Sequence, residues 1–246
     1  MRLCKDVYLV GSGSSGFDMT SPWDCHVYLV DGGNEAALID AGVGLATDEI
    51  LANCREDIGQ VKKIKYVLIT HTHADHCGGA AQWRRKLGAN VYVSRPLAWQ
   101  LRTGDEDAMH LTYARAAGIY PKNYRMRPCP VDVELVEDDI IQIGKFKLRV
   151  LATSGQCRGH ISFYGDVAGK KVLFAGDTVF FGGKILLINT RDCNLHEYKE
   201  TIYKLAKLKV DMLLPSHGSP SLSNGQRHLQ IAKNTLDSLS IPPNLF

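Results

Sequence analysis

The chain has 246 residues, of which 45% are hydrophobic and 22% are charged, as in ordinary globular proteins. Its length suits one large domain or two small ones. The formal net charge of +3 is small and dispersed, which argues against a nucleic-acid or membrane partner, and no apolar run approaches the length of a membrane-spanning helix.

The cysteines indicate a reducing environment. There are seven of them, they are scattered, and no Cys-x-x-Cys pair occurs. This pattern favours reduced thiols over a disulfide framework. Residues 1–6 hold no long apolar stretch of the kind found in signal peptides. We therefore expect a cytoplasmic protein, in which Cys77 and Cys157 stand apart because both fall in candidate site loops.

The first quarter of the chain is predicted to form strands. A short strand at residues 7–10 leads into a loop of glycine and serine at 11–16. This loop lacks the Lys-Ser/Thr ending of a phosphate-binding loop, and no helical pattern follows it, which disfavours that function. Two more strands, at 26–30 and 36–39, are joined by a hairpin turn at 31–34.

A dense cluster of metal-ligand residues follows. A helix is predicted at 47–57 and a short apolar strand at 66–70, and the chain then reads His71-Thr72-His73-Ala74-Asp75-His76. Three histidines and one aspartate within six residues indicate a metal site, because imidazole and carboxylate groups bind zinc and iron. The carboxyl ends of strands are also where ligands usually bind in open α/β folds.

The middle of the chain mixes strand and helix. A helix at 80–87 and a strand at 91–93 favour α/β layering. Residues 95–127 are helical and irregular, rich in aromatic and basic side chains, and without metal-ligand spacing. We interpret this segment as a surface helical insertion that either overhangs the site or only packs its aromatic residues. His110, within it, is interpreted as an ordinary helix residue.

The second half returns to strands followed by helices. Asn194 is predicted to cap a helix whose apolar face runs to Leu208. The last helix is expected at about 224–239. The predicted strands are 140–143, 146–151, 161–164, 171–175 and 211–214.

Three loops in this half also place metal-type side chains after apolar runs. They are the stretch 155–160, the Gly176-Asp177-Thr178 loop and the Ser216-His217-Gly218 loop. One such loop would be weak support for a site. Three of them, in a chain that already holds the cluster at 71–76, jointly indicate a common centre.

The cluster at 71–76 resembles the His-x-His-x-Asp-His signature of the metallo-β-lactamase superfamily. The hairpin at 28–42 and the three later loops resemble the other superfamily motifs in order, so the resemblance runs from Tyr28 to His217. It implies an αββα sandwich with the site at one edge. We expect a single domain over residues 1–246, with the insertion at about 95–127.

The resemblance also implies roles for individual residues. Asp40, at the end of the hairpin, is expected to support the site rather than bind metal. Asp177 would bridge two ions. The first metal site would contain His71 and His73, and the second Asp75, His76 and His217.

One motif departs from the superfamily pattern. Where the family has Thr-Pro-Gly-His-x-x-Gly-His, this chain has Thr153-Ser-Gly-Gln-Cys-Arg-Gly-His160. Gln156 therefore occupies the place of a metal-binding histidine, and His160 matches the second, non-binding one. We predict that Gln156 joins the first site through its amide oxygen or a bridging water, with His160 and Cys157 as rivals. An amide is a poorer zinc ligand than imidazole, so this site should be weakened or take another metal.

The predicted function is metal-dependent hydrolysis of an ester-like bond in a small molecule. Resemblance to glyoxalase II-like and lactonase-like members of the superfamily implies that this bond is a thioester or a lactone. A metal-bound hydroxide would attack, and Asp75 would orient it. The expected cofactor is zinc, as one or two ions, with iron or manganese as substitutes. Arg158 could favour an anionic substrate. The alternatives are an iron-dependent oxidoreductase or dioxygenase of the same superfamily and a metal-binding protein with weakened catalysis. The sequence carries no signal for an oligomeric state.

Overall fold

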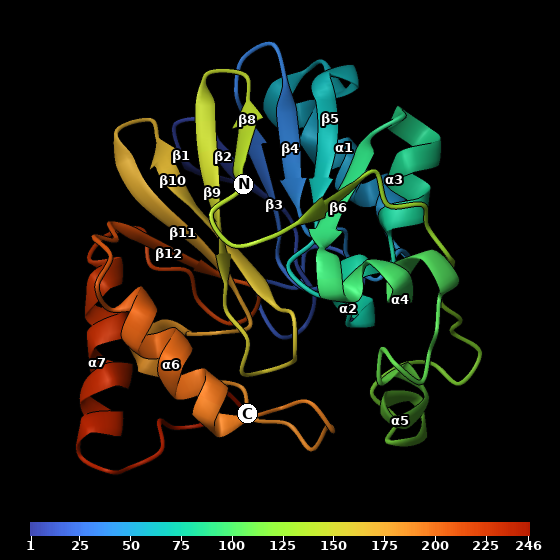
Figure 1. Cartoon of the computed structure of the whole chain (residues 1–246). Coiled ribbons are helices and arrows are strands. Elements are labelled where there is room, and N and C mark those ends of the chain that lie inside the picture. The colour runs from blue at the N-terminus through green and yellow to red at the C-terminus, as the bar shows by residue number, and fades with distance from the viewer.

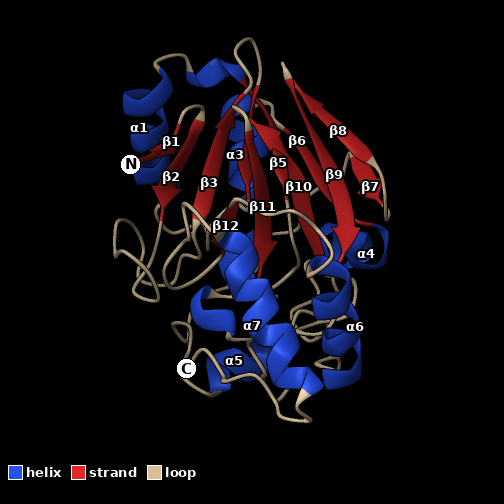
Figure 2. Ribbon diagram, turned by 90° about the vertical axis from the view of Figure 1, so that its left-hand side faces the viewer, coloured by secondary structure: helices blue, strands red, loops and turns tan.

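Two β-sheets lie face to face, and helices cover the outer face of each (Figures 1 and 2). The computed structural model describes residues 1–246. The four layers form an αββα sandwich, which confirms the predicted fold class. None of the helices combines the length and apolar character needed to cross a membrane.

The larger sheet has seven strands, which follow one another in space as they do in the sequence. Its first four strands are antiparallel, and its last four, from β4 onward, are parallel. The strands are β1 (Arg2–Cys4), β2 (Val7–Gly11), β3 (Val27–Asp31), β4 (Ala36–Ile39), β5 (Ile64–Leu68), β6 (Asn90–Ser94) and β7 (Val133–Leu135).

The smaller sheet has five strands in the order β12-β11-β10-β9-β8. All its pairs are antiparallel except β11 with β12, which are parallel. The strands are β8 (Ile140–Ile143), β9 (Phe146–Ala152), β10 (Ile161–Val167), β11 (Lys170–Gly176) and β12 (Met212–Pro215).

The helices fall into two groups. The first half of the chain supplies α1 (Thr47–Ile58), α2 (Ala74–Cys77), α3 (Ala80–Leu87), α4 (Ala98–Thr103) and α5 (Leu111–Ala116), with 3-10 turns η1 (Val61–Lys63) and η2 (Arg95–Leu97). The second half supplies α6 (Leu195–Leu205), α7 (Gly225–Asp237) and the 3-10 turn η3 (Phe181–Gly183). Asn194 caps α6 as predicted, because its side chain accepts hydrogen bonds from the amides of His196 and Glu197.

Three hydrophobic clusters account for the layers. One joins the larger sheet to its helices around Trp83, and another joins the smaller sheet to α6 and α7 around Tyr198. The third fills the space between the sheets around Phe163 and Phe174. Successive side chains of a strand point to opposite faces, so a strand that is buried on both faces contributes alternate side chains to two clusters.

Predicted and observed elements agree in most of the chain. The main omissions are β1 and β7, each of only three residues. The strand predicted at 66–70 lies two residues earlier, at Ile64–Leu68. Thr70 has left the strand, and its carbonyl accepts a hydrogen bond of 2.9 Å from the amide of Ile161 in the other sheet. This bond joins the two sheets beside the cluster at 71–76.

The packing between the sheets makes Phe163 a test of the sandwich. Its side chain is fully buried between the sheets. We expect Phe163→Ala to lower the free energy of unfolding by about 3–5 kcal/mol, because the cavity cannot fully collapse. Urea unfolding measures this change. Ile140→Ala is the control, since Ile140 is 57% exposed on β8 and its loss should have little effect. Equal effects of both variants would contradict the assignment of Phe163 to the core.

Candidate metal centre

Four loops meet at one end of the sandwich, at the lower end of the strands in Figure 1. The first follows β5 and carries His71, His73, Asp75 and His76. The others follow β9, β11 and β12 and carry Gln156, Asp177 and His217 respectively. The structure therefore brings together all the site residues predicted from the sequence.

The backbone of the first loop explains the spacing of its ligands. His71 and His73 lie two positions apart between β5 and α2, and their rings meet at 3.0 Å between Nε2 of His71 and Nδ1 of His73. His73 is also the residue before α2, with extended backbone angles of −66° and 149°. Asp75 and His76 then lie in the short helix α2 and approach the same point from the helical side.

The second site is a compact set of two carboxylates and two imidazoles. The Oδ2 atom of Asp75 lies 3.1 Å from Nε2 of His76 and 3.2 Å from Nε2 of His217. The carboxylate of Asp177 lies 3.5 Å from Nε2 of His76 and 3.6 Å from Nε2 of His217. Asp75, His76 and His217 form one of the side-chain groups whose ligand atoms are close enough to hold a metal ion.

The first site is poorer in charge. Nε2 of His71 lies 3.0 Å from Nδ1 of His73, and the amide Nε2 of Gln156 lies 2.9 Å from the same Nδ1. Asp177 completes the set, with its Oδ2 3.9 Å from Nε2 of His71. Gln156 thus lies beside the first-site histidines, with its amide nitrogen toward His73, and Asp177 is the one ionisable acid in this set.

Unpartnered atoms mark the centre as a place for a cation. Nε2 of His76, Oδ1 of Asp177 and Oε1 of Gln156 are buried and have no hydrogen-bond partner in the chain. Buried polar atoms are normally satisfied, so three such atoms in one centre indicate a missing partner. Imidazole nitrogen and carboxylate oxygen are ligands of zinc, iron and manganese, and these residues therefore fit a metal.

The two sites differ in their protonation. Burial and the neighbouring histidines hold the pKa of His71 well below its usual range, and burial lowers that of His73, so both present free nitrogen lone pairs at neutral pH. Burial alone would raise the pKa of Asp75, but His76 and His217 hold it well below its usual range. Burial opposes the charge on His76, yet Asp75 raises its pKa well above the ordinary value. The carboxylate charge in the second site therefore raises the pKa of its neighbour His76, whereas burial lowers the pKa values of the first-site histidines.

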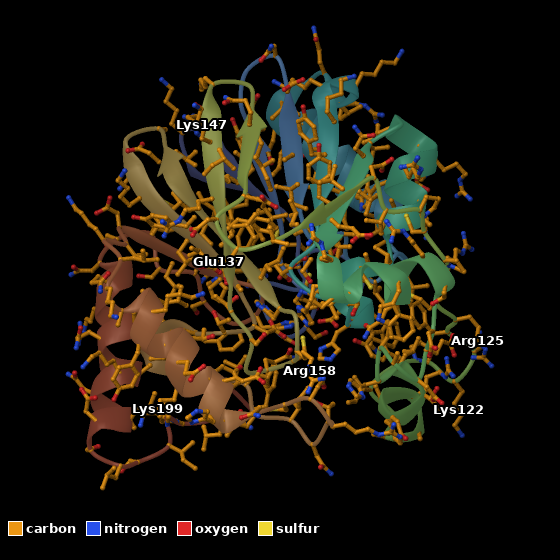
Figure 3. The ribbon with its side chains drawn as sticks, in the orientation of Figure 1. Lys122, Arg125, Glu137, Lys147, Arg158 and Lys199 are labelled. Carbon is orange, nitrogen blue, oxygen red and sulfur yellow. The ribbon has the colours of Figure 1, made fainter.

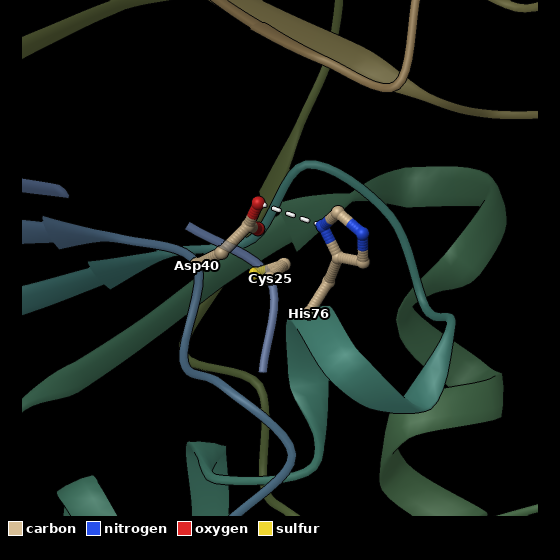
Figure 4. Close-up of side chains that lie close together, drawn as sticks. All are labelled: Cys25, Asp40 and His76. Atoms are coloured by element: carbon tan, nitrogen blue, oxygen red, sulfur yellow. Dashed lines mark hydrogen bonds and ion pairs between the residues drawn. The ribbon is translucent and has the colours of Figure 1, made fainter. Parts of the chain in front are cut away.

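A buried hydrogen-bond network supports the ligands from behind. Asp40 accepts hydrogen bonds from the hydroxyl of Thr70 and lies 2.9 Å from Nδ1 of His76 (Figure 4). The contact with Asp40 orients the His76 ring so that Nε2 faces the centre. Carboxylates commonly orient metal-binding histidines in this way. Cys25 lies beside this pair, but burial raises the pKa of its thiol, so it lacks the thiolate that a metal would need.

His160 and Cys157 are poorly suited to bind a metal in this structure. Nδ1 of His160 lies 2.8 Å from the hydroxyl of Thr153, and its Nε2 accepts a hydrogen bond from the amide of Asp177 at 3.0 Å. Both ring nitrogens are thus engaged. Burial raises the pKa of the Cys157 thiol well above its usual value, which keeps it protonated.

The segment 95–127 reaches the centre, which the sequence left open. The hydroxyl of Tyr120 donates a hydrogen bond of 2.8 Å to Oδ1 of Asp75. His110 is 6.2 Å from His73 between ring centroids and lies 2.7 Å from Asp192. His110 is the residue that precedes α5, so it lies just outside the helix. No spacing signal marks these residues, because their partners are far away in the sequence.

Arg158 lies in the gap between the α5 side and the α6 side of this end of the molecule (Figure 3). Its side chain is exposed, and its backbone amide donates a hydrogen bond of 3.1 Å to Asp192. The guanidinium has no ion-pair partner in the chain.

The chain is similar in sequence to one family of proteins along most of its length. The model of the family described as "Metallo-beta-lactamase superfamily" matches residues 20–217. A hydroxyacylglutathione hydrolase of Hahella chejuensis is 33% identical over 161 residues, which are 65% of this chain and 50% of that protein. The chain thus spans about half the length of this relative. The human acyl-coenzyme A thioesterase MBLAC2 is 24% identical over 234 residues, covering 88% of this chain and 80% of the relative.

Solved structures of metallo-beta-lactamases share the fold. The enzyme GOB-18 of Elizabethkingia meningoseptica superposes with a TM-score of 0.74 at 22% identity, over 97% of this chain and 89% of that one. The subclass B3 enzyme BJP-1 of Bradyrhizobium japonicum gives a TM-score of 0.72 at 22% identity, over 97% and 91% of the two chains.

Gln156 gives a direct test of the first site. We expect Gln156→His to raise the amount of zinc held per chain, because a third imidazole replaces a neutral amide. Metal content after dialysis, measured by atomic emission, reports the change. The same substitution at Gln142, on the exposed side of β8, is the control. An unchanged metal content in Gln156→His would remove the assignment of Gln156 to the first site.

His160 makes stability depend on pH. Burial lowers its pKa from 6.5 to about 3 in the folded chain. Between these values the unfolded chain binds a proton that the folded chain does not, so stability falls as the solution is acidified. Acidification from pH 7 to pH 5 should lower the free energy of unfolding by about 2 kcal/mol through His160. Urea unfolding at both pH values should show a smaller loss in His160→Gln than in the parent. His196→Gln, at a site 78% exposed, should keep the full loss.

Proposed function

The chain belongs to the metallo-beta-lactamase superfamily and is an enzyme, and from this premise we propose that it is a metal-dependent hydrolase of thioesters. The observation that carries the proposal is the convergence of two carboxylates and four histidines, with unpartnered buried atoms, at one end of the sandwich. We propose that zinc is the metal, as one or two ions. A small-molecule substrate fits both relatives, whose names describe thioester cleavage.

The proposed ligands divide between two ions. In the first site, His71 and His73 would bind through neutral nitrogens, and Gln156 would contribute its amide oxygen after a rotation of the amide. In the second site, Asp75 would bind with His76 and His217. Asp177 would be shared, because its Oδ2 lies 3.5 Å from His76 and 3.9 Å from His71, and its Oδ1 lies 3.6 Å from His217.

A bound divalent cation would lower the pKa of water towards neutrality and polarise the carbonyl oxygen of the thioester. The chain's own residues place the reactants. The Asp75 side chain is 14% exposed, whereas that of Asp177 is 2% exposed, so Asp75 is the carboxylate that incoming water can reach. We assign it the role of orienting that water and receiving its proton during attack.

The overall reaction needs no further reagent. Water oxygen forms a bond to the carbonyl carbon of the thioester, and the carbon–sulfur bond breaks. The products are a carboxylate and a thiol: one water proton passes to the leaving sulfur, and the other leaves the new carboxylic acid for bulk water. Asp75, which receives the first of these protons, would transfer it to the leaving sulfur. Arg158, exposed and without an ion-pair partner, would attract an anionic part of the substrate.

Two other functions remain as outcomes of the test. An iron-dependent oxidoreductase of the same superfamily would use the same ligands with a different metal, since selectivity follows ligand type and geometry. The second is a metal-binding protein whose catalysis is weakened by Gln156. Both predict no release of thiol from thioesters.

Thiol release tests the proposed function. The protein, purified from its native host and with its metals counted, is assayed on a hydroxyacylglutathione, an acyl-coenzyme A and a lactone. We expect turnover of a thioester that is lost on chelation, restored by zinc and reduced at least 100-fold in Asp75→Asn. Asp138→Asn, at a side chain 69% exposed, is the matched control and should keep full activity. Bound iron, with oxygen consumption and no thiol release, would overturn the proposal.

A further inference from the structure

Tyr120 is a buried polar residue that the proposed mechanism does not use. It comes from the segment after α5 and not from any of the ligand-bearing loops. Its side chain is 9% exposed, and its hydroxyl donates to Oδ1 of Asp75 at 2.8 Å. A phenol is protonated at neutral pH, so the direction of this bond is fixed: Tyr120 donates and the carboxylate accepts.

The bond divides the two oxygens of Asp75 between different tasks. Oδ1 accepts the hydrogen bond from Tyr120, whereas Oδ2 lies 3.1 Å from His76 and 3.2 Å from His217. A free carboxylate on a short helix could rotate about its terminal torsion, which is broad and roughly two-fold. Anchoring Oδ1 removes that freedom and leaves only Oδ2 to face the histidines.

The segment around Tyr120 holds it firmly. The end of α5 is closed by hydrogen bonds from the amides of Gly118 and Ile119, and Gly118 has a φ of +78°, which glycine adopts without strain. The next turn is pinned from the side, because Arg115 lies 2.7 Å from Glu106 and donates to the carbonyl of Tyr124 at 3.0 Å. Hydrogen bonds on both sides of Tyr120 therefore fix the turn from which its side chain reaches Asp75.

We propose that Tyr120 is a positioning residue for the second site: its hydroxyl holds Asp75 so that Oδ2 alone faces the cation. The inference rests on the proposed metal centre but not on the identity of the substrate. It also gives the segment 95–127 a role at the centre beyond covering it. Partners behind metal ligands typically contribute 10- to 100-fold to metal affinity.

The chain supplies its own control for simple packing. Tyr124 stacks on Tyr120, with ring centroids 5.7 Å apart and planes inclined by 25°. It is equally buried, at 8%, but its hydroxyl donates to the backbone carbonyl of Val43. Tyr120→Phe and Tyr124→Phe thus remove the same group from the same aromatic pair, and only one of them touches Asp75.

The experiment measures metal binding directly. Zinc affinity of each variant is determined by competition with a chelating dye, and cobalt spectra report the geometry around the ion. We expect Tyr120→Phe to weaken zinc binding at the second site by 10- to 100-fold and to change the cobalt spectrum. Tyr124→Phe should bind as the parent does. Urea unfolding of both variants checks that neither has lost its fold.

A double variant asks whether Tyr120 acts through Asp75. In an Asp75→Ala background, the added Tyr120→Phe change should have no further effect on zinc affinity, because the group it positions is gone. Parent-like zinc binding in Tyr120→Phe would overturn the proposal, and so would equal losses in Tyr120→Phe and Tyr124→Phe. None of these results depends on thioester turnover, so failure of the proposed function would leave this test intact.

Discussion

The burial of two carboxylates, Asp75 and Asp177, is the constraint on which the rest of the centre depends. Removing a charge from water costs several kcal/mol unless partners compensate for it. His76 and His217 supply that compensation and lie within 3.6 Å of both carboxylates. The partners come from three separate loops, so the centre exists only when both sheets are in place. The hydrogen bond from Ile161 to Thr70 joins the sheets at that point.

Much of this arrangement could be predicted because its parts are local in the sequence. Each ligand-bearing loop follows a strand whose apolar residues stand out in the sequence, and the chain direction then places the loop at the strand end. Gln156 was predicted from its register against the superfamily motif, and its amide nitrogen lies 2.9 Å from Nδ1 of His73. His160 shows why register mattered. Its imidazole is close to the centre, but both nitrogens are bound within the chain, to Thr153 and to the amide of Asp177.

The contacts that could not be predicted are those made by residue types without a spacing signal. Tyr120 and Asp75 are 45 positions apart, and His110 and Asp192 are 82 apart. The sequence around a tyrosine in a surface segment looks the same whether its side chain packs against a helix or donates a hydrogen bond to a buried carboxylate. The strands β1 and β7 were missed for a related reason, since three residues are too few to show alternation. In each case tertiary packing decides the structure, and the local sequence does not.

The physical asymmetry of the centre follows from its charges. The second site holds Asp75, whose pKa lies well below its usual range, with His76 and His217, whose pKa values the neighbouring carboxylates raise. The first site offers two histidines whose pKa values burial lowers, and an amide. In the proposed centre both cations would share the carboxylate of Asp177. A cation at the second site would therefore weaken the attraction of Asp177 for a cation at the first site. A third imidazole would offset this competition by its stronger bond, and Gln156 offers only an amide dipole. Glutamine in place of histidine at position 156 therefore changes the relative metal affinity of the two sites. It leaves the first site dependent on the carboxylate of Asp177, which the second site also uses.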